Sequence, residues 1–340
     1  MSRRSFLQRS AAIALGAGLP TRARAVDTEQ PAADADDHFH TIKTDDLSVV
    51  IGDNTSHGEH RAGYHGIWRI TSAHNSQAVF VPRYSGLNLN HIAPTPENDQ
   101  LEPRQSPVEL KVDVPSRQVT LHQPETRTTH VESWLTYTAS GPHHIDWTYR
   151  YKLHDPALFK SNFAGFYLAS YLDQPENKAI YVLSPSCCRA IMWIQYCPPT
   201  HLKDAAITWE NDPYDLEFGP HDFLSHVNRA PITYHVPLYF GRLGNMLLAN
   251  MFEEPKGVTI CYGMAGGGFV PDQSDRNPAW DFFLYTKDPA SHPEGQWRGR
   301  LVYKPFAGRD DVLDEYQRFQ DALGRKWARP KYGPLAQAGE

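Results

Sequence analysis

Hydrophobic and polar residues alternate along much of the chain, which is the pattern of β-strands with one buried face. In HHIDWTYRYK, Ile145, Trp147, Tyr149 and Tyr151 share one face, while polar and charged residues occupy the other. Similar alternation appears in HVESWLTYT, VELKVDV, RQVTLHQ, GVTICYGM and GRLVYKPF, and Pro-Ser-Arg in VDVPSRQVT predicts a hairpin loop between two of these runs. The domain is therefore predicted to consist mainly of strands.

One segment near the C-terminus has helical spacing instead. In GRDDVLDEYQRFQDALGRK the apolar residues recur every three or four positions, and two aspartates stand where the helix dipole favours negative charge. Gly324 follows the last apolar residue and is a typical helix stop. The spacing predicts a helix over about 309–324, with a buried face formed by Val312, Leu313, Tyr316, Phe319 and Leu323.

Many short strands and one terminal helix indicate two sheets packed face to face, because each sheet must bury an apolar face. No internal repeat suggests a propeller or solenoid. The predicted fold is all-β, a large antiparallel two-sheet β-sandwich with one C-terminal helix; a jelly roll is the alternative. This strand pattern resembles the galactose-mutarotase-type supersandwich, which is shared by sugar epimerases, several polysaccharide lyases and glycosidase accessory domains. A fold does not fix a reaction, so the chemistry must come from residues.

The first residues, SRRSFLQRS followed by AAIALGAGL, resemble a twin-arginine export signal, with Ala23 and Ala25 at a small-x-small cleavage site. We expect this signal over residues 1–25 and a periplasmic or secreted protein. The segment 26–45 is acidic and nearly free of aliphatic residues, which predicts a disordered leader before a single domain over 46–330. The apolar run is shorter than the ~20 residues of a membrane span, so no span is expected.

Charge and composition narrow the partners. The net charge is −6 at pH 7 and no basic run follows the N-terminal signal, which argues against nucleic acid as a partner. The four cysteines contain no zinc-type CxxC pair and are predicted to be packing residues. The content of Trp, Tyr, His, Asn and Pro is common in extracellular proteins that handle carbohydrate. We therefore expect an oligo- or polysaccharide ligand and no cofactor.

The stretch SHGEHRAGYHGIW concentrates candidate chemistry. His57, His60 and His65 could supply three ligands to a zinc ion, which is the metal alternative. The glycines between them indicate a loop, where spacing alone specifies little. The favoured interpretation is the lip of a ligand cleft, followed by a structural turn and then by a metal site.

The segment GIWRITSAHNSQAVFVPRYSGLNLNHI has the residue types of a sugar pocket. Trp68 and Tyr84 offer flat faces for a pyranose ring, and side chains that can orient hydroxyls or a uronate carboxylate follow. These polar candidates are His74, Asn75, Arg83, Asn88, Asn90 and His91. Later in the chain, Arg242 could grip a carboxylate and Trp280 could stack on a sugar.

Carboxylates are candidates for a different reaction. Glu210 and Asp222 lie in the acidic, aromatic loop WENDPYDLEFGPHDF, and Glu132 lies in a predicted strand. Glycoside hydrolysis needs a pair of such groups. Carboxylates on a loop can also bind calcium, which is a minor alternative here.

We predict an exported carbohydrate-active enzyme, either a glycoside hydrolase or a polysaccharide lyase, with a uronate-containing substrate if the reaction is elimination. The predicted acid or base is a histidine, His65, His74 or His91, because imidazole titrates near neutral pH. If the reaction is elimination, Arg83, Arg242 or an asparagine pair would stabilise the negative charge of a uronate or an enolate-like transition state. The alternatives are a non-catalytic carbohydrate-binding protein, a sugar epimerase and a histidine-ligated metalloenzyme. The leading hypothesis requires His65, Asn88, His91 and Arg242 to gather around one concavity.

Overall fold

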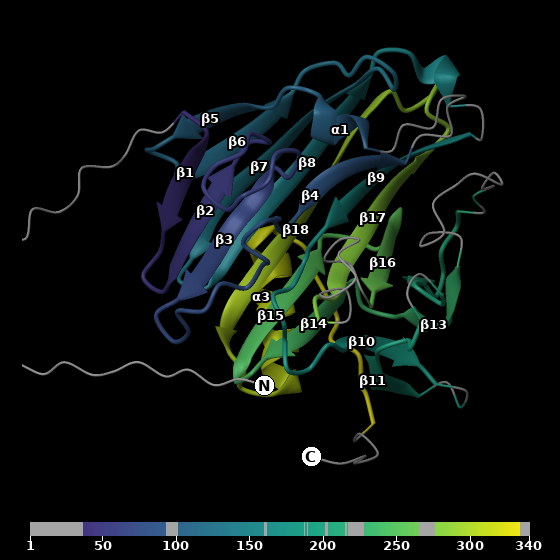
Figure 1. Ribbon diagram of the computed structural model, residues 1–340. Coiled ribbons are helices and arrows are strands. Elements are labelled where there is room, and N and C mark those ends of the chain that lie inside the picture. The colour runs from purple at the N-terminus through teal and green to yellow at the C-terminus, as the bar shows by residue number, and fades with distance from the viewer. Residues whose placement is uncertain are drawn as a thin grey trace, which may run out of the picture. The chain divides into compact units, whose positions relative to one another are not determined.

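The protein is described by a computed structural model that covers residues 37–92, 101–159, 162–186, 188, 190–200, 203–214, 216, 228–264 and 276–333. The described residues form three β-sheets and a few helices (Figure 1). No helix among these residues is long and apolar enough to cross a membrane.

The largest sheet has nine strands, and each pair of neighbours in it runs antiparallel. From one edge to the other the strands are β11 (Ile191–Tyr196), β10 (Ile180–Pro185), β14 (Leu238–Leu243), β15 (Met246–Phe252), β18 (Glu294–Pro305), β8 (His144–Leu153), β7 (Val131–Gly141), β6 (Gln118–Gln123) and β5 (Glu109–Asp113). The predicted hairpin after Val112 is confirmed, because β5 pairs with β6 across it.

A six-stranded sheet packs against the first. Its strands, in spatial order, are β13 (Arg229–Tyr234), β12 (Ala206–Trp209), β16 (Val258–Gly263), β17 (Ala279–Lys287), β9 (Phe163–Ala169) and β4 (Asn88–Ile92). Only the β12–β13 pair is parallel. A smaller sheet contains β1 (Phe39–Lys43), β2 (Leu47–Gly52) and β3 (Gly66–Ser72).

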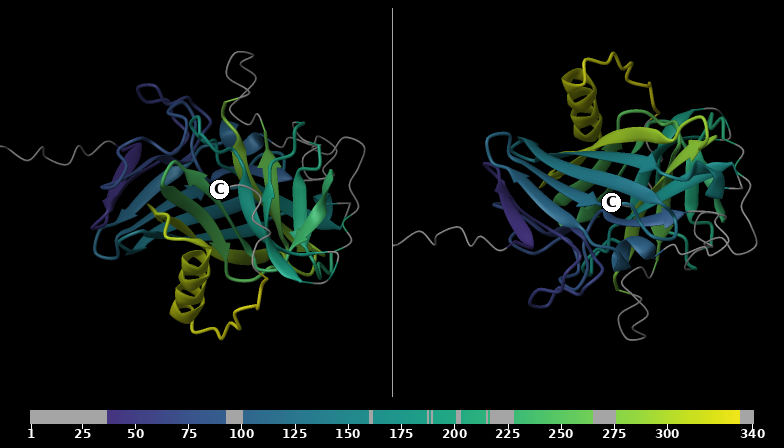
Figure 2. Two further views of the ribbon diagram at one scale, coloured as in Figure 1. Left: turned by 90° about the horizontal axis from the view of Figure 1, so that it is seen from below. Right: turned by 90° about the horizontal axis from the view of Figure 1, so that it is seen from above.

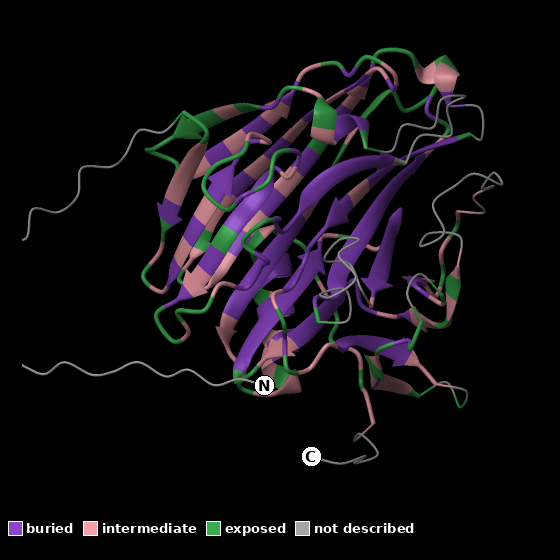
Figure 3. Ribbon diagram, viewed as in Figure 1, coloured by how far each residue is buried: buried purple, intermediate pink, exposed green. Residues whose placement is uncertain are grey.

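Aromatic rings from both large sheets form the core between them. Trp147 of β8 stacks on Phe282 of β17 with 5.2 Å between ring centroids, and Tyr151 of β8 lies 4.7 Å from Phe166 of β9. The residues of β8 alternate between buried and more exposed positions, as Figure 3 shows. This confirms the face predicted from HHIDWTYRYK and the two-sheet β-sandwich.

The C-terminal helix α3 (Arg309–Ala322) lies on the outer face of the nine-stranded sheet, away from the smaller sheets (Figure 2). Leu247, Ala249 and Met251 of β15 pack against it, whereas Leu248 and Phe252 join the core between the sheets. Strand β15 is consequently buried on both faces, so its sequence shows no alternation. The predicted helix is confirmed, and Gly324 follows it at φ 69°.

The leader prediction is wrong for residues 39–43. These residues form β1, which pairs with β2 in register from Phe39–Gly52 to Lys43–Ser48. Backbone pairing and the burial of Ile42 compensate for a composition that is poor in aliphatic residues. The predicted export signal and residues 26–36 lie outside the described residues.

Candidate functional site

The outer face of the six-stranded sheet carries polar residues within a mostly apolar setting. Asn88 and Asn90 of β4 stand opposite Ala169 and Tyr167 of β9, and directly opposite residues in an antiparallel pair project from the same face. On β17, Phe282 points into the core between the sheets, so its neighbour Asp281 projects from this outer face. Strand register therefore brings residues from three separate segments together.

Arg104, on the four-residue helix α1 (Glu102–Gln105), is the cation of this face. Its Nε donates to Asn90 Oδ1 at 2.8 Å, and its two Nη atoms donate to the hydroxyls of Tyr64 and Tyr171, both at 2.9 Å. All three acceptors are neutral. Among the described residues no carboxylate lies within ion-pair distance of Arg104, so the positive charge of its guanidinium can attract an anionic ligand.

Asp281 is the acid of the same face, and it is 2% exposed. Its Oδ2 accepts a hydrogen bond of 2.6 Å from the Tyr167 hydroxyl, and its Oδ1 accepts one of 2.7 Å from the Ser170 N–H. Burial raises the pKa of Asp281 to about 7, although these hydrogen bonds and the charge of Arg104 favour the ionised form. Asp281 can therefore gain or lose a proton near neutral pH, as acid–base catalysis requires.

Tyrosine rings surround the arginine. Tyr64 lies 4.7 Å from Tyr84 and 5.8 Å from Tyr171, measured between ring centroids. Burial raises the pKa of Tyr171 to about 12, against the opposing effect of Arg104. We refer to Tyr64, Asn90, Arg104, Tyr167, Tyr171 and Asp281 as the Arg104–Asp281 cluster.

The backbone beside the cluster has two conformations that few residues adopt. Leu87 is buried at φ 54°, a region that bulky residues rarely occupy, and its N–H donates to the Ser170 hydroxyl at 3.1 Å. Gly66 has φ 120°, and a Cβ there would lie 2.5 Å from the carbonyl oxygen of Gly86. Such conformations concentrate at functional sites, because the surrounding structure must compensate for their cost.

His65 and His91 lie close to the cluster but do not have the predicted chemistry. The His65 carbonyl accepts hydrogen bonds from Ser85 and from Asn88 Nδ2, and the buried His91 ring lies on the inner face, bonded to the Thr129 hydroxyl. Burial lowers the pKa of His65 to about 3 and that of His91 to about 4. The prediction that these imidazoles titrate near neutral pH is corrected, since both stay uncharged there.

The stretch SHGEHRAGYHGIW folds as an ordered turn. His57 and His60 exchange backbone hydrogen bonds, the His60 ring stacks on Trp68 at 4.0 Å, and His60 Nε2 donates to the Tyr64 carbonyl at 2.7 Å. Trp68 is buried, and its indole N–H donates to the Asp53 carbonyl. Within the described ranges, no three His, Cys, Asp or Glu side chains are placed to hold a metal ion. The metal alternative at His57, His60 and His65 therefore gains no support.

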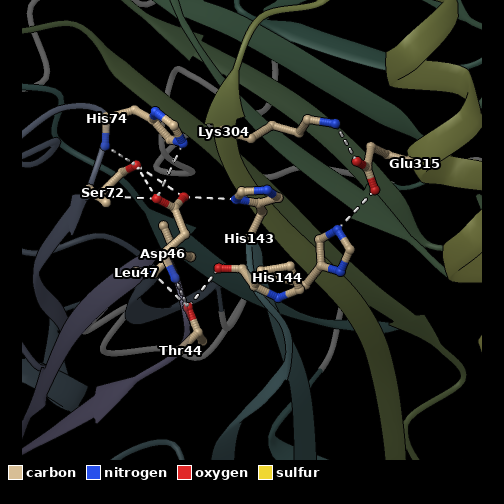
Figure 4. Close-up of polar contacts among 11 residues, drawn as sticks. Thr44, Asp46, Leu47, Ser72, His74, His143, His144, Lys304 and Glu315 are labelled. Atoms are coloured by element: carbon tan, nitrogen blue, oxygen red, sulfur yellow. Dashed lines mark hydrogen bonds and ion pairs between the residues drawn. The ribbon is translucent and has the colours of Figure 1, made fainter.

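His74 belongs to a different group of contacts, which Figure 4 shows. Asp46 accepts a hydrogen bond from Ser72 Oγ and pairs with His143 Nδ1 at 2.7 Å, while His74 Nε2 lies 3.9 Å from the same carboxylate. Beside it, His144 and Lys304 both bind Glu315 of α3. None of these contacts involves the Arg104–Asp281 cluster. His74 therefore does not belong to the same site as the cluster.

The other sequence candidates are dispersed. Arg83 is exposed, and Tyr84 is buried within the tyrosine group. Glu210 pairs with His235, and Asp222 lies outside the described residues. The prediction for Trp280 is corrected: its ring is buried in the core against Gly241, so it offers no face to a sugar.

Arg242 projects from the opposite side of the sandwich and does not join His65, Asn88 and His91 around one concavity.

Five residues of the cluster were not predicted from the sequence, and only one of them has a clear sequence signal. Asp281 is the sole charged residue in the otherwise apolar run AWDFFLY, and a carboxyl in such a strand must be paired or protonated. The others are Tyr64, Arg104, Tyr167 and Tyr171.

No family model and no curated protein matches the chain. Solved structures match it at low identity. A galactose mutarotase-like protein from Lactobacillus casei ATCC 334 has 9% identity and a TM-score of 0.44, over 78% of this chain and all of that one. A heparinase III has 9% identity and a TM-score of 0.39, over 81% of this chain and 35% of that one. A 4-alpha-glucanotransferase from Thermococcus litoralis has 10% identity and a TM-score of 0.35, over 78% of this chain and 37% of that one.

Proposed function

We propose that this protein is a carbohydrate-active enzyme that cleaves a uronate-containing oligo- or polysaccharide by elimination at the Arg104–Asp281 cluster. The observation that carries the proposal is a buried carboxyl with a pKa of about 7, bonded to a tyrosine, on the same face as an arginine that no described carboxylate pairs with. From the twin-arginine-like N-terminus we further propose that it acts in the periplasm or outside the cell.

Elimination requires a group that neutralises the uronate carboxylate. Binding of this carboxylate by Arg104, with Asn90 beside it, makes the hydrogen on the adjacent C5 carbon more acidic, because the enolate-like charge develops next to the guanidinium. Fixed hydrogen bonds hold Arg104 in one orientation, so little reorganisation is needed at the moment of reaction.

Elimination also requires a base and an acid. In the proposed step the C5 proton passes to the Tyr167 oxygen while the Tyr167 proton passes to Asp281 Oδ2. The bond from C4 to the leaving oxygen breaks with its electron pair, and a C4–C5 double bond forms. Tyr64 protonates the leaving oxygen, because it is half-buried and its hydroxyl accepts from Arg104, which leaves its own proton to donate.

Hydrolysis is the less favoured reaction, since it uses two carboxylates near the scissile bond. Asp281 is the one carboxylate bonded within the cluster, as far as the described residues go. Of the predicted acids, Glu210 pairs with His235, and Glu132 pairs with His122 and His154 on the nine-stranded sheet.

The test is to incubate the full chain with uronate-containing and neutral polysaccharides and to follow ultraviolet absorbance and new reducing ends. We expect both signals with a uronate polymer, and neither after Asp281→Asn or Tyr167→Phe. Tyr137→Phe is the matched control, because the buried Tyr137 hydroxyl has no hydrogen-bond partner within the described part of the chain. Reducing ends without absorbance would replace elimination with hydrolysis. Binding without a product would indicate a non-catalytic protein.

A further inference from the structure

A polar concavity lies apart from the Arg104–Asp281 cluster. It has a volume of about 460 Å³, and its wall includes Glu176, Asn177, Lys178, Gln195, Cys197 and Arg242. Pockets that bind small molecules typically measure ~300–1,000 Å³, so this one can hold a ligand the size of a sugar.

Strand register separates the pocket from the cluster. Arg242 stands opposite Leu247, and Gln195 stands opposite Tyr181. Leu247 and Tyr181 belong to the apolar group that packs with α3 on the outer face of the nine-stranded sheet. Arg242 and Gln195 therefore line the pocket from that face, whereas the cluster lies on the outer face of the six-stranded sheet.

Arg242 has unused hydrogen-bonding capacity in this pocket. Its guanidinium lies over the Phe306 ring at 4.7 Å, and one Nη donates to the Gly244 carbonyl at 3.3 Å. Its Nε is buried without a described acceptor, and no described carboxylate pairs with Arg242. The other Nη has no described acceptor either, and it can donate a charge-assisted hydrogen bond to an oxyanion in the pocket.

The opposite wall is held in place by hydrogen bonds. Asn177 Nδ2 donates to the Tyr181 hydroxyl at 3.0 Å, Asn177 Oδ1 accepts from the Ala179 N–H, and the Lys178 carbonyl accepts from the Trp280 indole. The Glu176 carboxylate on this wall has no hydrogen bond or ion pair with the described residues. It can accept hydrogen bonds from ligand hydroxyls, which an anion alone would not offer.

We propose that this pocket is a second ligand site, which binds a sugar acid with its carboxylate on Arg242 and its hydroxyls toward Glu176 and Gln195. The site does not depend on the reaction proposed for the cluster. The ligand can be a free hexuronate or the end residue of a uronate chain, since both present the same groups.

The test is calorimetric titration of the full chain carrying Arg104→Gln, which removes the carboxylate-binding arginine proposed for the cluster, with D-glucuronate, D-glucose, acetate and a uronate oligosaccharide. We expect glucuronate to bind at least tenfold more tightly than glucose or acetate. Arg242→Gln should remove this preference, whereas Arg83→Gln, at an exposed arginine, should leave it unchanged. Glucuronate binding that persists without Arg104 separates the pocket from the cluster. Binding of the oligosaccharide without the monosaccharide would keep the site and identify a chain end as its ligand.

A second measurement needs no change at Arg242. Cys197 is exposed on the pocket wall, and Cys188 is exposed outside it. Saturating glucuronate should slow alkylation of Cys197 at least threefold and leave Cys188 unaffected, as followed by peptide mass spectrometry. Unchanged alkylation of Cys197 under both glucuronate and the uronate oligosaccharide, or a preference for the uronate ligand that survives Arg242→Gln, would overturn the proposal.

Discussion

The outer faces of the two large sheets differ in how their carboxylates are paired. On strands β7 and β8 of the nine-stranded sheet, carboxylates have charged partners: Glu132 binds His122 and His154, and Asp146 forms two hydrogen bonds with Arg300. On the six-stranded sheet Arg104 is held by neutral oxygens, and the pKa of Asp281 is close to neutral pH. Paired charges on a partly wet face are typical of structural surfaces, whereas buried and unbalanced ones are typical of reactive sites.

The largest effect should come from the carboxyl of the six-stranded face. Asp281→Asn removes the proposed proton acceptor, so we expect the rate of product formation to fall roughly 100- to 10,000-fold. The wild-type rate should rise with pH through about 7, as Asp281 ionises. Glu132→Gln on the other face should stay within about twofold of wild type in the same assay, consistent with a structural role. Equal losses in the two variants would contradict the contrast between the faces.

The stability of the protein should depend on pH through the same group. Because the pKa of Asp281 is about 7 when folded and 3.8 in its ordinary state, the folded chain holds a proton that the unfolded chain releases between these values. The contribution to the free energy of unfolding is therefore greatest at low pH, and it falls by up to about 1.4 kcal/mol per pH unit as the pH rises to 7. Urea titrations of Asp281→Asn should lack this component. A pH dependence identical to wild type would contradict the assigned protonation.

A smaller effect is expected where α3 meets the nine-stranded sheet (Figure 4). Burial alone would raise the pKa of Glu315, but bonds from His144, Arg318 and Lys304 outweigh it and hold that pKa below its usual 4.5. Glu315→Gln should cost about 3 kcal/mol of unfolding free energy near neutral pH, because it leaves a partly buried lysine without its closest partner. The stabilisation by Glu315 is fully present above its ordinary pKa of 4.5 and is lost as the pH falls through the lower pKa that Glu315 has in the folded protein. The variant and wild type should consequently converge in acid denaturation.

The smallest effect is expected on the partly wet face. The Trp134 ring of β7 lies between His122 and Arg150. The centroids of the Trp134 and His122 rings are 5.1 Å apart, and Arg150 Cζ lies 4.0 Å from the Trp134 centroid. His122→Ala should cost about 1 kcal/mol or less and should matter less at high salt, because its ion pairs are partly solvated. Thermal melts at low and high salt would measure this, and a loss above about 2 kcal/mol would show a larger structural role for His122 and the Trp134 ring stacked on it.

The fold was largely predictable because strands with one wet face carry their own signal. The alternation in β8 and the helical spacing of α3 each follow from a single buried face. Strand β15 gives no such signal because both of its faces are covered, and β1 was missed because pairing with β2, rather than its composition, orders it.

The candidate site was less predictable. Asn88 and Asn90 were placed on one polar edge, and both project from the cluster face. Arg104 stands in a four-residue helix whose position is set by contacts distant in sequence, so no local pattern marks it. The prediction that Trp280 stacks on a sugar was wrong because an aromatic ring can equally pack in a hydrophobic core, and this one does. The histidines misled because burial, which the sequence does not show, decides their charge.

Ser170 links Asp281 to the backbone that precedes β4. Its N–H binds the carboxyl and its hydroxyl accepts from the strained backbone of Leu87, one residue before β4 and three before the amide that holds Arg104. We expect a change of charge at Asp281 to alter the strength of the bond from the Ser170 N–H. The protonation state of Asp281 should then affect the position of Asn90 and of the arginine proposed to bind the substrate, so that substrate binding and proton transfer are coupled.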